Sequence, residues 1–324
     1  MPVMRATARA HTNIALIKYW GKKDQNLILP MNSSLSLTLD KFFTDTTVEY
    51  LPAFKQDEFI LNNKPKKDEK LTNFMDLIRN HTHTSLYARI TSTNHVPTSA
   101  GLASSASAYA ALAVAATAAT GNYYNQTELS RLARRGSGSA TRSLFGGFVE
   151  WVKGHDDLSS FARPIVLPND WDIRMIAIVV DDKPKKISSR LGMQKVVETS
   201  PFYTDWVRSA TKDLNDIKLA MKNGDFHRFG EIAESNALKM HALNLSAVPH
   251  FNYFEPASLI AMEIVEKLRD CGLQCYYTLD AGPNVKVICK KNDLSVILKK
   301  LQGKFPADHL LVAAPGPAAE LLKS

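Results

Sequence analysis

A long uncharged helix, preceded by a loop of small residues, constrains this chain more than any other stretch. Residues 104–119 contain no glycine, no proline and no charged side chain, and alanine, the strongest helix former, dominates them. Such a helix would be roughly 24 Å long, and a helix that is apolar on all sides belongs inside a protein. We therefore expect a buried helix that crosses a domain.

The beginning of this helix is a candidate anion site. Pro97 and Gly101 favour a tight turn, and Ser104 and Ser105 can cap the helix. The unpaired N–H groups of a helix N-terminus bind phosphate, and a serine hydroxyl can serve as a magnesium ligand. The loop lacks the Gly-Lys-Ser/Thr ending of a Walker A motif and the three glycines of a dinucleotide-binding loop. Taken alone, the stretch fits a well-capped core helix equally well.

The charge balance points to an anionic partner. The chain has 324 residues, enough for one large or two ordinary domains, and a net charge of +8 with a pI near 9.2. Both nucleic acid and a small polyphosphate would suit such a charge. Because the sequence has no arginine-rich block, no alternation of aromatic and basic residues and no zinc-ligand spacing, we do not expect nucleic acid.

The cysteines and the N-terminus bear on location. Three cysteines without metal-ligand spacing, Cys271, Cys275 and Cys289, suggest reduced thiols in a cytoplasmic protein. We expect no signal peptide and no membrane span, since no apolar run approaches 18 residues. Residues 1–20 are basic like a transit peptide, but their alternation predicts a strand.

The chain divides into two halves. In the first, alternating apolar and polar residues predict antiparallel strands, with helices near residues 71–79 and 127–135. In the second, long helices within residues 201–270 precede two strands, a helix and a strand. Together with the apolar strand before them, these elements follow the order of a ferredoxin-like domain. We place the boundary at the end of that strand, between an N-terminal domain, residues 1–180, and a C-terminal domain, residues 181–324.

Two further segments combine small residues with cations. The segment Lys18-Tyr-Trp-Gly-Lys22 can direct compact positive charges at a phosphate or carboxylate, although a solvated lysine turn explains it as well. In the glycine- and serine-rich segment 136–147, Arg142 offers a planar guanidinium to such a group. A flexible linker is the alternative there, but it is less favoured because strand-like sequence resumes at once.

Three other features are weaker signals. Arg190 lies near a predicted helix N-terminus, where a cation is unfavourable and can mark a ligand site. Asp280 lies among turn-forming residues and fits an ordinary hairpin turn. His81 and His83, just beyond the predicted helix 71–79, could bind a metal, but a surface role is favoured because no third ligand is evident.

Four motifs, taken together, resemble those of one enzyme family. They are Asn13-Ile-Ala-Leu-Ile-Lys-Tyr-Trp-Gly-Lys22, Pro97-Thr-Ser-Ala-Gly-Leu-Ala-Ser-Ser-Ala106, Ser137-Gly-Ser-Ala-Thr-Arg142 and Asp280-Ala-Gly-Pro-Asn284. In this order they are similar to the motifs of the diphosphomevalonate decarboxylases, within the GHMP small-molecule kinase superfamily. The second motif alone would indicate only a GHMP phosphate loop, whereas the first and third point to this family rather than to other GHMP kinases. The resemblance spans essentially the whole chain.

The resemblance implies a fold and a reaction. The fold would be the α+β GHMP kinase fold, with an N-terminal domain like the second domain of ribosomal protein S5 and a ferredoxin-like C-terminal domain. The substrate would be mevalonate 5-diphosphate, with ATP and Mg²⁺ as cofactors. Phosphorylation of the tertiary 3-hydroxyl, followed by loss of that phosphate and CO₂, would give isopentenyl diphosphate. A homodimer is also implied.

The same resemblance implies roles for individual residues. Asp280 would orient or deprotonate the 3-hydroxyl, Lys18 would keep Asp280 ionised, Arg142 would grip the C1 carboxylate, and Asn13 would be a fourth catalytic residue. The other residues implied to bind substrate are Tyr19, Trp20, Gly21, Lys22, Ser137, Gly138, Ser139, Ala140, Thr141, Ser189, Arg190 and Met193. Those implied to bind ATP are Gly101, Leu102, Ala103, Ser104, Ser105 and Ser107 in a phosphate loop at residues 97–107, with Ser104 or Ser105 near Mg²⁺.

Three alternatives stay open at this point. A mevalonate-type 3-kinase would phosphorylate the same hydroxyl without eliminating it, but the presence of Asp280, Lys18 and Arg142 together argues against this activity. A phosphomevalonate decarboxylase would act on the monophosphate. A non-catalytic sensor with the GHMP fold would bind ligand without turnover. Whether Asp280 acts as a base or as an electrostatic anchor is also open.

Overall fold

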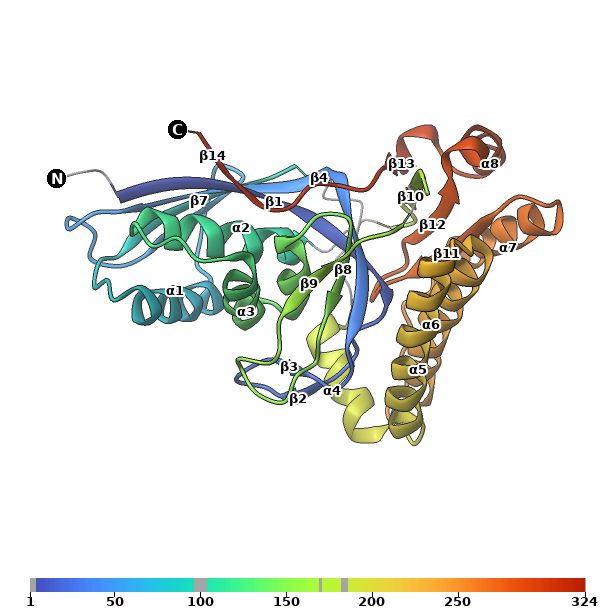
Figure 1. Ribbon diagram of the computed structural model, residues 1–324, viewed down its shortest axis with the longest axis horizontal. Coiled ribbons are helices and arrows are strands. Elements are labelled where there is room, and N and C mark those ends of the chain that lie inside the picture. The colour runs from blue at the N-terminus through green and yellow to red at the C-terminus, as the bar shows by residue number, and fades with distance from the viewer. Residues whose placement is uncertain (1–3, 96–103, 169–170, 182–185, 324) are drawn as a thin grey trace.

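The computed structural model describes residues 4–95, 104–168, 171–181 and 186–323. Helices and mixed sheets build it, which confirms the predicted α+β class (Figure 1). The described strands form one eight-stranded sheet, one four-stranded sheet and a small hairpin of β2, Lys22–Asp24, and β3, Leu29–Pro30. The two larger sheets lie in different halves of the molecule (Figure 1).

The first sheet is built around two long antiparallel strands, β1 and β4. The order of its strands is β14-β1-β4-β7-β5-β6, and β8 extends it by pairing with β4 and β9. These strands are β1, Met4–Ile17; β4, Ser34–Tyr50; β5, Glu58–Leu61; β6, Lys64–Lys66; β7, Ala88–Asn94; β8, Phe148–Trp151; β9, Ala162–Ile165; and β14, Glu320–Leu322.

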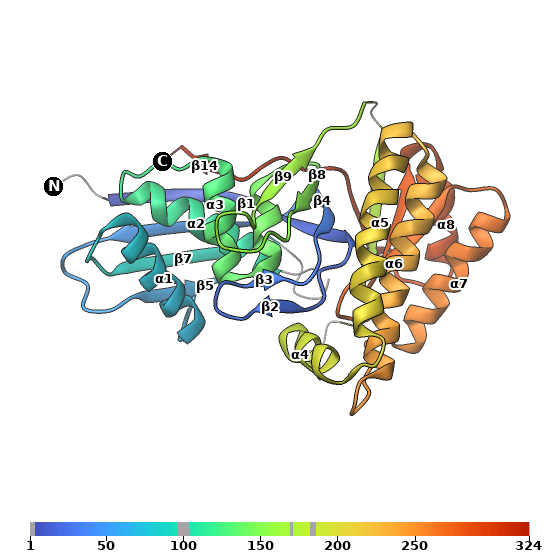
Figure 2. The same cartoon turned by 60° about the horizontal axis from the view of Figure 1, so that its bottom comes forward.

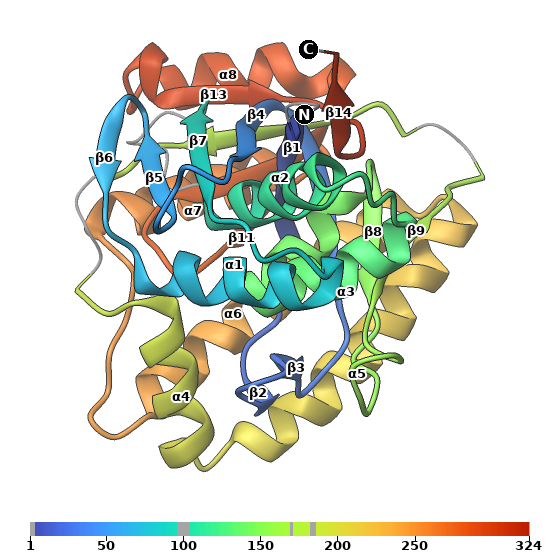
Figure 3. The same cartoon turned by 90° about the vertical axis from the view of Figure 1, so that its left-hand side faces the viewer.

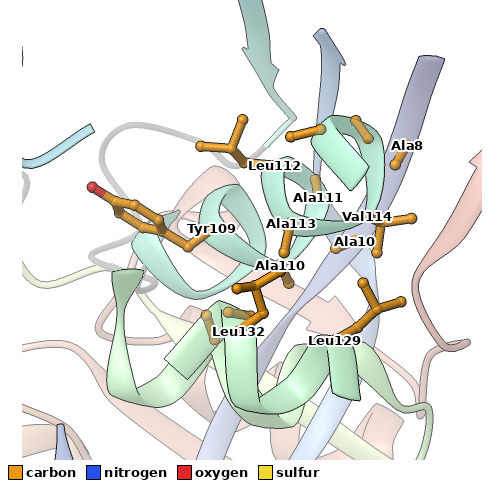
Figure 4. Close-up of a cluster of buried hydrophobic side chains, with 14 of the residues drawn as sticks. Ala8, Ala10, Tyr109, Ala110, Ala111, Leu112, Ala113, Val114, Leu129 and Leu132 are labelled. Carbon is orange, nitrogen blue, oxygen red and sulfur yellow. The ribbon is translucent and has the colours of Figure 1, made fainter. Parts of the chain in front are cut away.

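Helix α2, Ser104–Ala119, forms the centre of the first core. Its alanines pack near Ala8 and Ala10 of β1, and these small side chains let helix and sheet approach closely (Figure 4). Gly121, with a φ of 78°, turns the chain just after the helix. The predicted buried central helix is thus confirmed.

Two helices on the same side of the sheet differ in detail from their predictions (Figure 1). Helix α1, Glu69–Thr82, is longer than predicted because Asp68 caps its first turn, so that His81 lies in its last turn and not beyond it. Helix α3, Gln126–Gly136, is capped by Asn125 rather than by Thr127, because Asn125 and Glu128 form a capping box.

The segment after α3 is a helix and not a flexible linker. Residues Gly138–Leu144 form a 3₁₀ helix, η2, and most of its side chains are buried. Small residues suit this tighter helix because they let it lie against α2 and α3. Arg142 is therefore held on a rigid element.

The second sheet has four antiparallel strands in the order β11-β12-β10-β13. They are β10, Ile173–Ile178; β11, Cys275–Leu279; β12, Val285–Lys290; and β13, Leu310–Ala313. The helices of this half are α4, Ser189–Thr199; α5, Tyr203–Asn223; α6, Phe226–Ser246; α7, Pro256–Asp270; and α8, Leu294–Gln302. Four helices follow β10 and one follows β12, which confirms the predicted ferredoxin-like order.

Two strands pair across the boundary that the sequence analysis placed at residue 180. Strand β10, which lies before residue 180, pairs with β12 and β13 of the second sheet. Strand β14, near the C-terminus, returns to the first sheet and pairs with β1 (Figure 3). The ferredoxin-like order predicted from the sequence already included β10, whereas nothing in the sequence indicated the return of β14.

Helix α4 occupies a separate place in the molecule. It lies near the β2–β3 hairpin, at one end of the molecule (Figure 2). Gly192 of α4 fits closely against Phe251 and Tyr253, where a Cβ atom would come within 2.7 Å of the Tyr253 hydroxyl. Within the described residues, no helix has both the length and the apolar character that crossing a membrane requires.

Candidate active site

A cleft of about 260 Å³ brings together residues of the predicted site. It is lined by Asn13, Ala15, Lys18, Tyr19, Trp20, Lys22, Ile28, Lys70, Ser105, Gly136, Ser137, Gly138, Ser139, Arg142, Ser189, Arg190, Met193, Met240, Asp280 and Ala281. These residues come from β1 and the segment after it, the β2–β3 hairpin, α1, α2, the end of α3, η2, α4, α6 and the β11–β12 turn. Both halves of the molecule therefore contribute to one cleft.

Lys18 and Asp280 form an ion pair on the wall of the cleft. The Lys18 ammonium donates hydrogen bonds to Asp280 Oδ1 at 2.8 Å and to the Ala15 carbonyl at 2.7 Å. The Lys18 side chain is 2% exposed, and burial lowers its pKa to about 8 although the Asp280 carboxylate opposes the shift. The carboxylate, at 27% exposed, can still meet a ligand.

The backbone of Lys18 is also fixed, by residues that the sequence analysis did not single out. Its N–H donates to Asn236 Oδ1 of α6 at 2.8 Å, and its carbonyl accepts from Asn32 at 2.9 Å. The Asn236 amide donates in turn to Asp213 of α5 at 2.8 Å, and Lys239 donates to both oxygens of Asp213. A chain of polar contacts thus joins two helices to the Lys18 backbone.

Arg142 is held in the cleft by neutral partners. Its guanidinium donates to Asn13 Oδ1 at 3.2 Å and to Ser34 Oγ at 2.6 Å. Asn13 is itself fixed because its amide donates to the Ser139 carbonyl and to Ser143 Oγ. Burial lowers the pKa of Arg142 to about 10, so the side chain stays cationic at neutral pH.

A second group of cations, Lys22, Lys70 and Arg190, also lines the cleft. Burial, together with the charges of Arg190 and Lys70, lowers the pKa of Lys22 to about 8. Burial and Arg190 also lower the pKa of Lys70. Cations that lie close together in a partly buried cleft repel one another, and a strongly anionic group relieves this repulsion. Such a cluster can therefore bind a strongly anionic group.

Aromatic side chains close one wall. The Tyr19 ring packs edge-on against Trp151 at 4.7 Å, and a Cβ atom at Gly138 would come within 2.8 Å of Tyr19. Among the described residues, the buried Tyr19 hydroxyl has no hydrogen-bond partner, and its ring lines the cleft. Such an orphaned hydroxyl fits a polar ligand at this wall.

Several predicted residues lie elsewhere. Gly21, Ala140 and Thr141 do not line the cleft, and Gly21 instead packs against Tyr203, whose hydroxyl a Cβ atom would meet at 1.7 Å. Ser107 is buried and hydrogen-bonds with Thr44 at 2.8 Å. Gly101, Leu102 and Ala103 lie outside the described residues, as does the side chain of Ser104. Ser105 lines the cleft from the beginning of α2.

Two lysines near the site were missed by the sequence analysis. Lys70 lies in the first turn of α1, where a cation is unfavourable, but the helix was predicted to begin only at Leu71. Lys286 lies on β12 among buried apolar residues, and its ammonium is 3.4 Å from Asp280 Oδ2. A lysine in the middle of an apolar strand is a signal that could have found it.

The potential metal ligands of the site are limited. Within the described part of the chain, no three His, Cys, Asp or Glu side chains are grouped so that they could hold a metal ion. A metal bound together with phosphate needs few protein ligands, because Mg²⁺ takes most of its oxygens from water and phosphate. Ser105 at the beginning of α2 fits this limited role.

Comparison with known proteins gives the same result for both halves. The family described as "Diphosphomevalonate decarboxylase-like N-terminal domain" matches residues 10–162. The family described as "Mevalonate 5-diphosphate decarboxylase C-terminal domain" matches residues 175–316.

Related sequences span nearly the whole chain. The diphosphomevalonate decarboxylase of Ganoderma lucidum is 38% identical over 335 residues, which cover 94% of this chain and 83% of that protein. The diphosphomevalonate decarboxylase of Homo sapiens is 33% identical over 329 residues, which cover 94% of this chain and 82% of that protein.

Solved structures agree closely with the fold. The mevalonate diphosphate decarboxylase from Staphylococcus aureus matches with a TM-score of 0.96 and 44% identity, over 99% of this chain and 98% of that chain. The mevalonate diphosphate decarboxylase from Enterococcus faecalis matches with a TM-score of 0.95 and 48% identity, over 99% of this chain and 100% of that chain.

A further structure, of MDDEF in complex with MVAPP, AMPPCP and magnesium, matches with a TM-score of 0.96 and 49% identity, over 99% of this chain and 100% of that chain. The predicted GHMP kinase fold is therefore confirmed. The chain belongs to the family of diphosphomevalonate decarboxylases.

Proposed function

We propose that this protein catalyses the ATP-dependent decarboxylation of mevalonate 5-diphosphate to isopentenyl diphosphate, with release of ADP, phosphate and CO₂. The observation that carries the proposal is the charge of the cleft. Five cationic side chains line it, Lys18, Lys22, Lys70, Arg142 and Arg190, whereas Asp280 is the one carboxylate among the described lining residues. A substrate with a carboxylate at one end and a diphosphate at the other complements this arrangement.

The two groups of cations suit the two ends of the substrate. Lys22, Lys70 and Arg190 would hold the diphosphate, and Ser189 and Met193 lie on the same side of the cleft. Arg142, aligned by Asn13 and Ser34, would hold the C1 carboxylate. The substrate between them would present its 3-hydroxyl to Asp280.

The reaction makes a poor leaving group into a good one. Phosphoryl transfer to the 3-hydroxyl replaces hydroxide by phosphate as the leaving group. When phosphate leaves C3, positive charge develops there, and the electron pair of the breaking C1–C2 bond forms the alkene as CO₂ departs. Asp280 would orient the hydroxyl and Arg142 the carboxylate, so that this chain contributes mainly positioning and electrostatic stabilisation.

ATP and Mg²⁺ are the proposed cofactors. The beginning of α2, with Ser105 on the cleft, would bind the ATP phosphates together with the loop before it. Mg²⁺ would neutralise the phosphate charge during transfer. The complex of MDDEF with AMPPCP and magnesium supports this assignment.

The domain organisation is also a proposal. We place the boundary in residues 166–172, between β9 of the first sheet and β10 of the second, which is earlier than the sequence alone suggested. The cleft would then lie between the domains. Homodimerisation and a cytoplasmic location stay predictions.

One reaction mixture tests the proposed function. Purified protein, Mg·ATP and mevalonate 5-diphosphate are incubated together, and ADP, phosphate, CO₂ and isopentenyl diphosphate are measured in the same samples. We expect equal amounts of all four products, because each turnover consumes one ATP and eliminates one phosphate.

Other outcomes would assign a different function. ADP with a 3-phosphorylated product and no CO₂ would mean a 3-kinase. Turnover with the 5-monophosphate alone would mean a phosphomevalonate decarboxylase. Absence of turnover with both substrates would favour a ligand sensor.

A further inference from the structure

Lys286 is a buried lysine outside the predicted site. It lies on β12, between Val285 and Val287, and its side chain is 1% exposed. Its ammonium donates a hydrogen bond to the Asn284 carbonyl at 3.0 Å and is 3.4 Å from Asp280 Oδ2. Burying an ammonium is costly unless a carboxylate or hydrogen-bond acceptors compensate for the lost water, so this position needs an explanation.

Asp280 already has a cation at its other oxygen. Lys18 contacts Oδ1 at 2.8 Å, so Lys18 and Lys286 together bracket the carboxylate. One lysine would suffice to neutralise one aspartate. The second lysine gives the cluster of Lys18, Asp280 and Lys286 a net positive charge, which does not favour folding. The extra charge does favour an ionised Asp280 that is fixed in position.

Among the residues that the structure describes, the other charged or titratable groups near Asp280 come from two further elements. Arg142 of η2 lies close enough for its charge to interact with Asp280. His241 of α6 also faces Asp280, but burial lowers its pKa to about 3, so it is neutral at working pH. Within the described parts of the chain, Lys18, just after β1, and Lys286, from β12, are the cations that form ion pairs with the carboxylate.

The contact with Asn284 links Lys286 to the segment that follows β10. While its carbonyl accepts from Lys286, the Asn284 side-chain oxygen accepts from the N–H groups of Val180 and Asp181 at 2.7 and 3.1 Å. The β11–β12 turn that carries Asp280 is thereby tied to the end of the β10 segment. Lys286 thus lies at a junction between the carboxylate and the chain that leads to α4.

We propose that Lys286 is a positioning residue for the reaction, which fixes the second oxygen of Asp280 and keeps the carboxylate ionised beside the substrate hydroxyl. This inference rests on the proposed function. A carboxylate with an ammonium at each oxygen is a weak base, so Asp280 orients the hydroxyl by accepting its hydrogen bond.

The test compares variants that remove the charge with one that keeps it. Lys286→Met keeps the length of the side chain without a charge, Lys286→Gln keeps a hydrogen-bond donor for the Asn284 carbonyl, and Lys286→Arg keeps the charge. Lys299→Met, at an exposed position of α8, is the matched control. For each variant, kcat and KM for mevalonate 5-diphosphate are measured from acid to alkaline pH, and urea unfolding is followed in parallel.

We expect both neutral variants to lose activity in a specific way. Without Lys286, a higher pH is needed to ionise Asp280, so the acid limb of kcat should move up by about one pH unit, with kcat reduced about tenfold below it. KM should stay within about threefold. In Lys286→Arg the acid limb of kcat should lie at the same pH as in wild type, because the charge is kept. The pH profile of Lys299→Met should not differ from that of wild type.

Each result has one meaning. If the wild-type enzyme is active and the acid limb of kcat does not move in either neutral variant, the proposed role of Lys286 is wrong. The proposed function is not affected by that result. A lower unfolding midpoint without a moved limb would show a purely structural residue. If Lys286→Met does not fold, Lys286→Gln decides the question. Wild-type protein without turnover would contradict the proposed function instead.

Discussion

Burial lowers the pKa of two lysines of the cleft, and the charged groups beside these lysines differ. Lys18 is fully buried and keeps its charge beside Asp280, whereas Lys22 is half-buried and lies near the cations Arg190 and Lys70. Burial lowers the pKa of each to about 8. Both must be protonated to act as cations, so their contributions are present below pH 8 and are lost as the pH rises through it.

This difference predicts a measurable pH dependence. In wild-type enzyme, kcat/KM for the diphosphate substrate should fall by about two logarithmic units per pH unit well above pH 8, since two protons are lost from the free enzyme. In Lys22→Arg the slope should be about one, because arginine stays protonated. Lys23→Arg, at the exposed neighbouring position, should keep the steeper slope. Equal slopes in Lys22→Arg and wild type would exclude Lys22 as one of the two groups.

At this scale the sequence predicts residues that lie inside motifs. Asn13, Lys18, Arg142 and Asp280 all line the cleft, because each motif is a short stretch whose local geometry carries its side chains. Lys70 and Lys286 could not be placed in this way. Their proximity to the site depends on how α1 and β12 pack against distant elements, which local spacing does not encode.

At the scale of elements, helices α5 and α6 fix the backbone of the site residue Lys18 through hydrogen bonds. Asn236 is fully buried and connects the backbone of Lys18 to Asp213, and Lys239 completes the contact. The site residue Lys18 follows β1 and is thus held by helices that come more than 180 residues later in the chain.

Removing this connection should affect stability and catalysis together. Asn236→Ala would leave the Lys18 N–H and the Asp213 carboxylate without their partner, which should lower the free energy of unfolding by roughly 1–3 kcal/mol. We also expect a lower kcat, because Lys18 would no longer be fixed. Ser235→Ala, at the exposed adjacent position, should change neither. Urea unfolding and steady-state kinetics measure both effects, and a destabilised variant with wild-type kcat would show that the connection does not serve Lys18.

Elements with a strong periodic pattern were predicted well, and their ends were not. The alanine-rich α2 and the ferredoxin-like order were predictable because composition and period determine them. The start of α1 was missed because Asp68 and Glu69 are polar, although Asp68 caps the helix. The 3₁₀ helix η2 was missed because a run of glycine and serine fits several backbone conformations.

At the scale of the whole molecule, the cleft depends on both sheets. Arg142 lies on η2, in the half that contains the first sheet, and Asp280 lies in the β11–β12 turn of the second sheet. Both side chains line one cleft because the two halves pack against each other. The return of β14 to the first sheet could not be predicted, because strand pairing between distant parts of the chain leaves no local pattern. The order of motifs along the chain was nevertheless sufficient to predict the family.

The central claim is that Asp280, held between two lysines, carries the chemistry of the cleft, and the variant Asp280→Asn tests it most directly. ADP formation and the affinity for mevalonate 5-diphosphate are measured on the same preparation, by single-turnover kinetics and by calorimetry. We predict that ADP formation falls at least about a thousandfold, because the hydroxyl is no longer oriented by a carboxylate. The dissociation constant should stay within about tenfold, since Arg142 and the Lys22 group still hold both ends of the substrate. ADP formation near the wild-type rate would contradict the account.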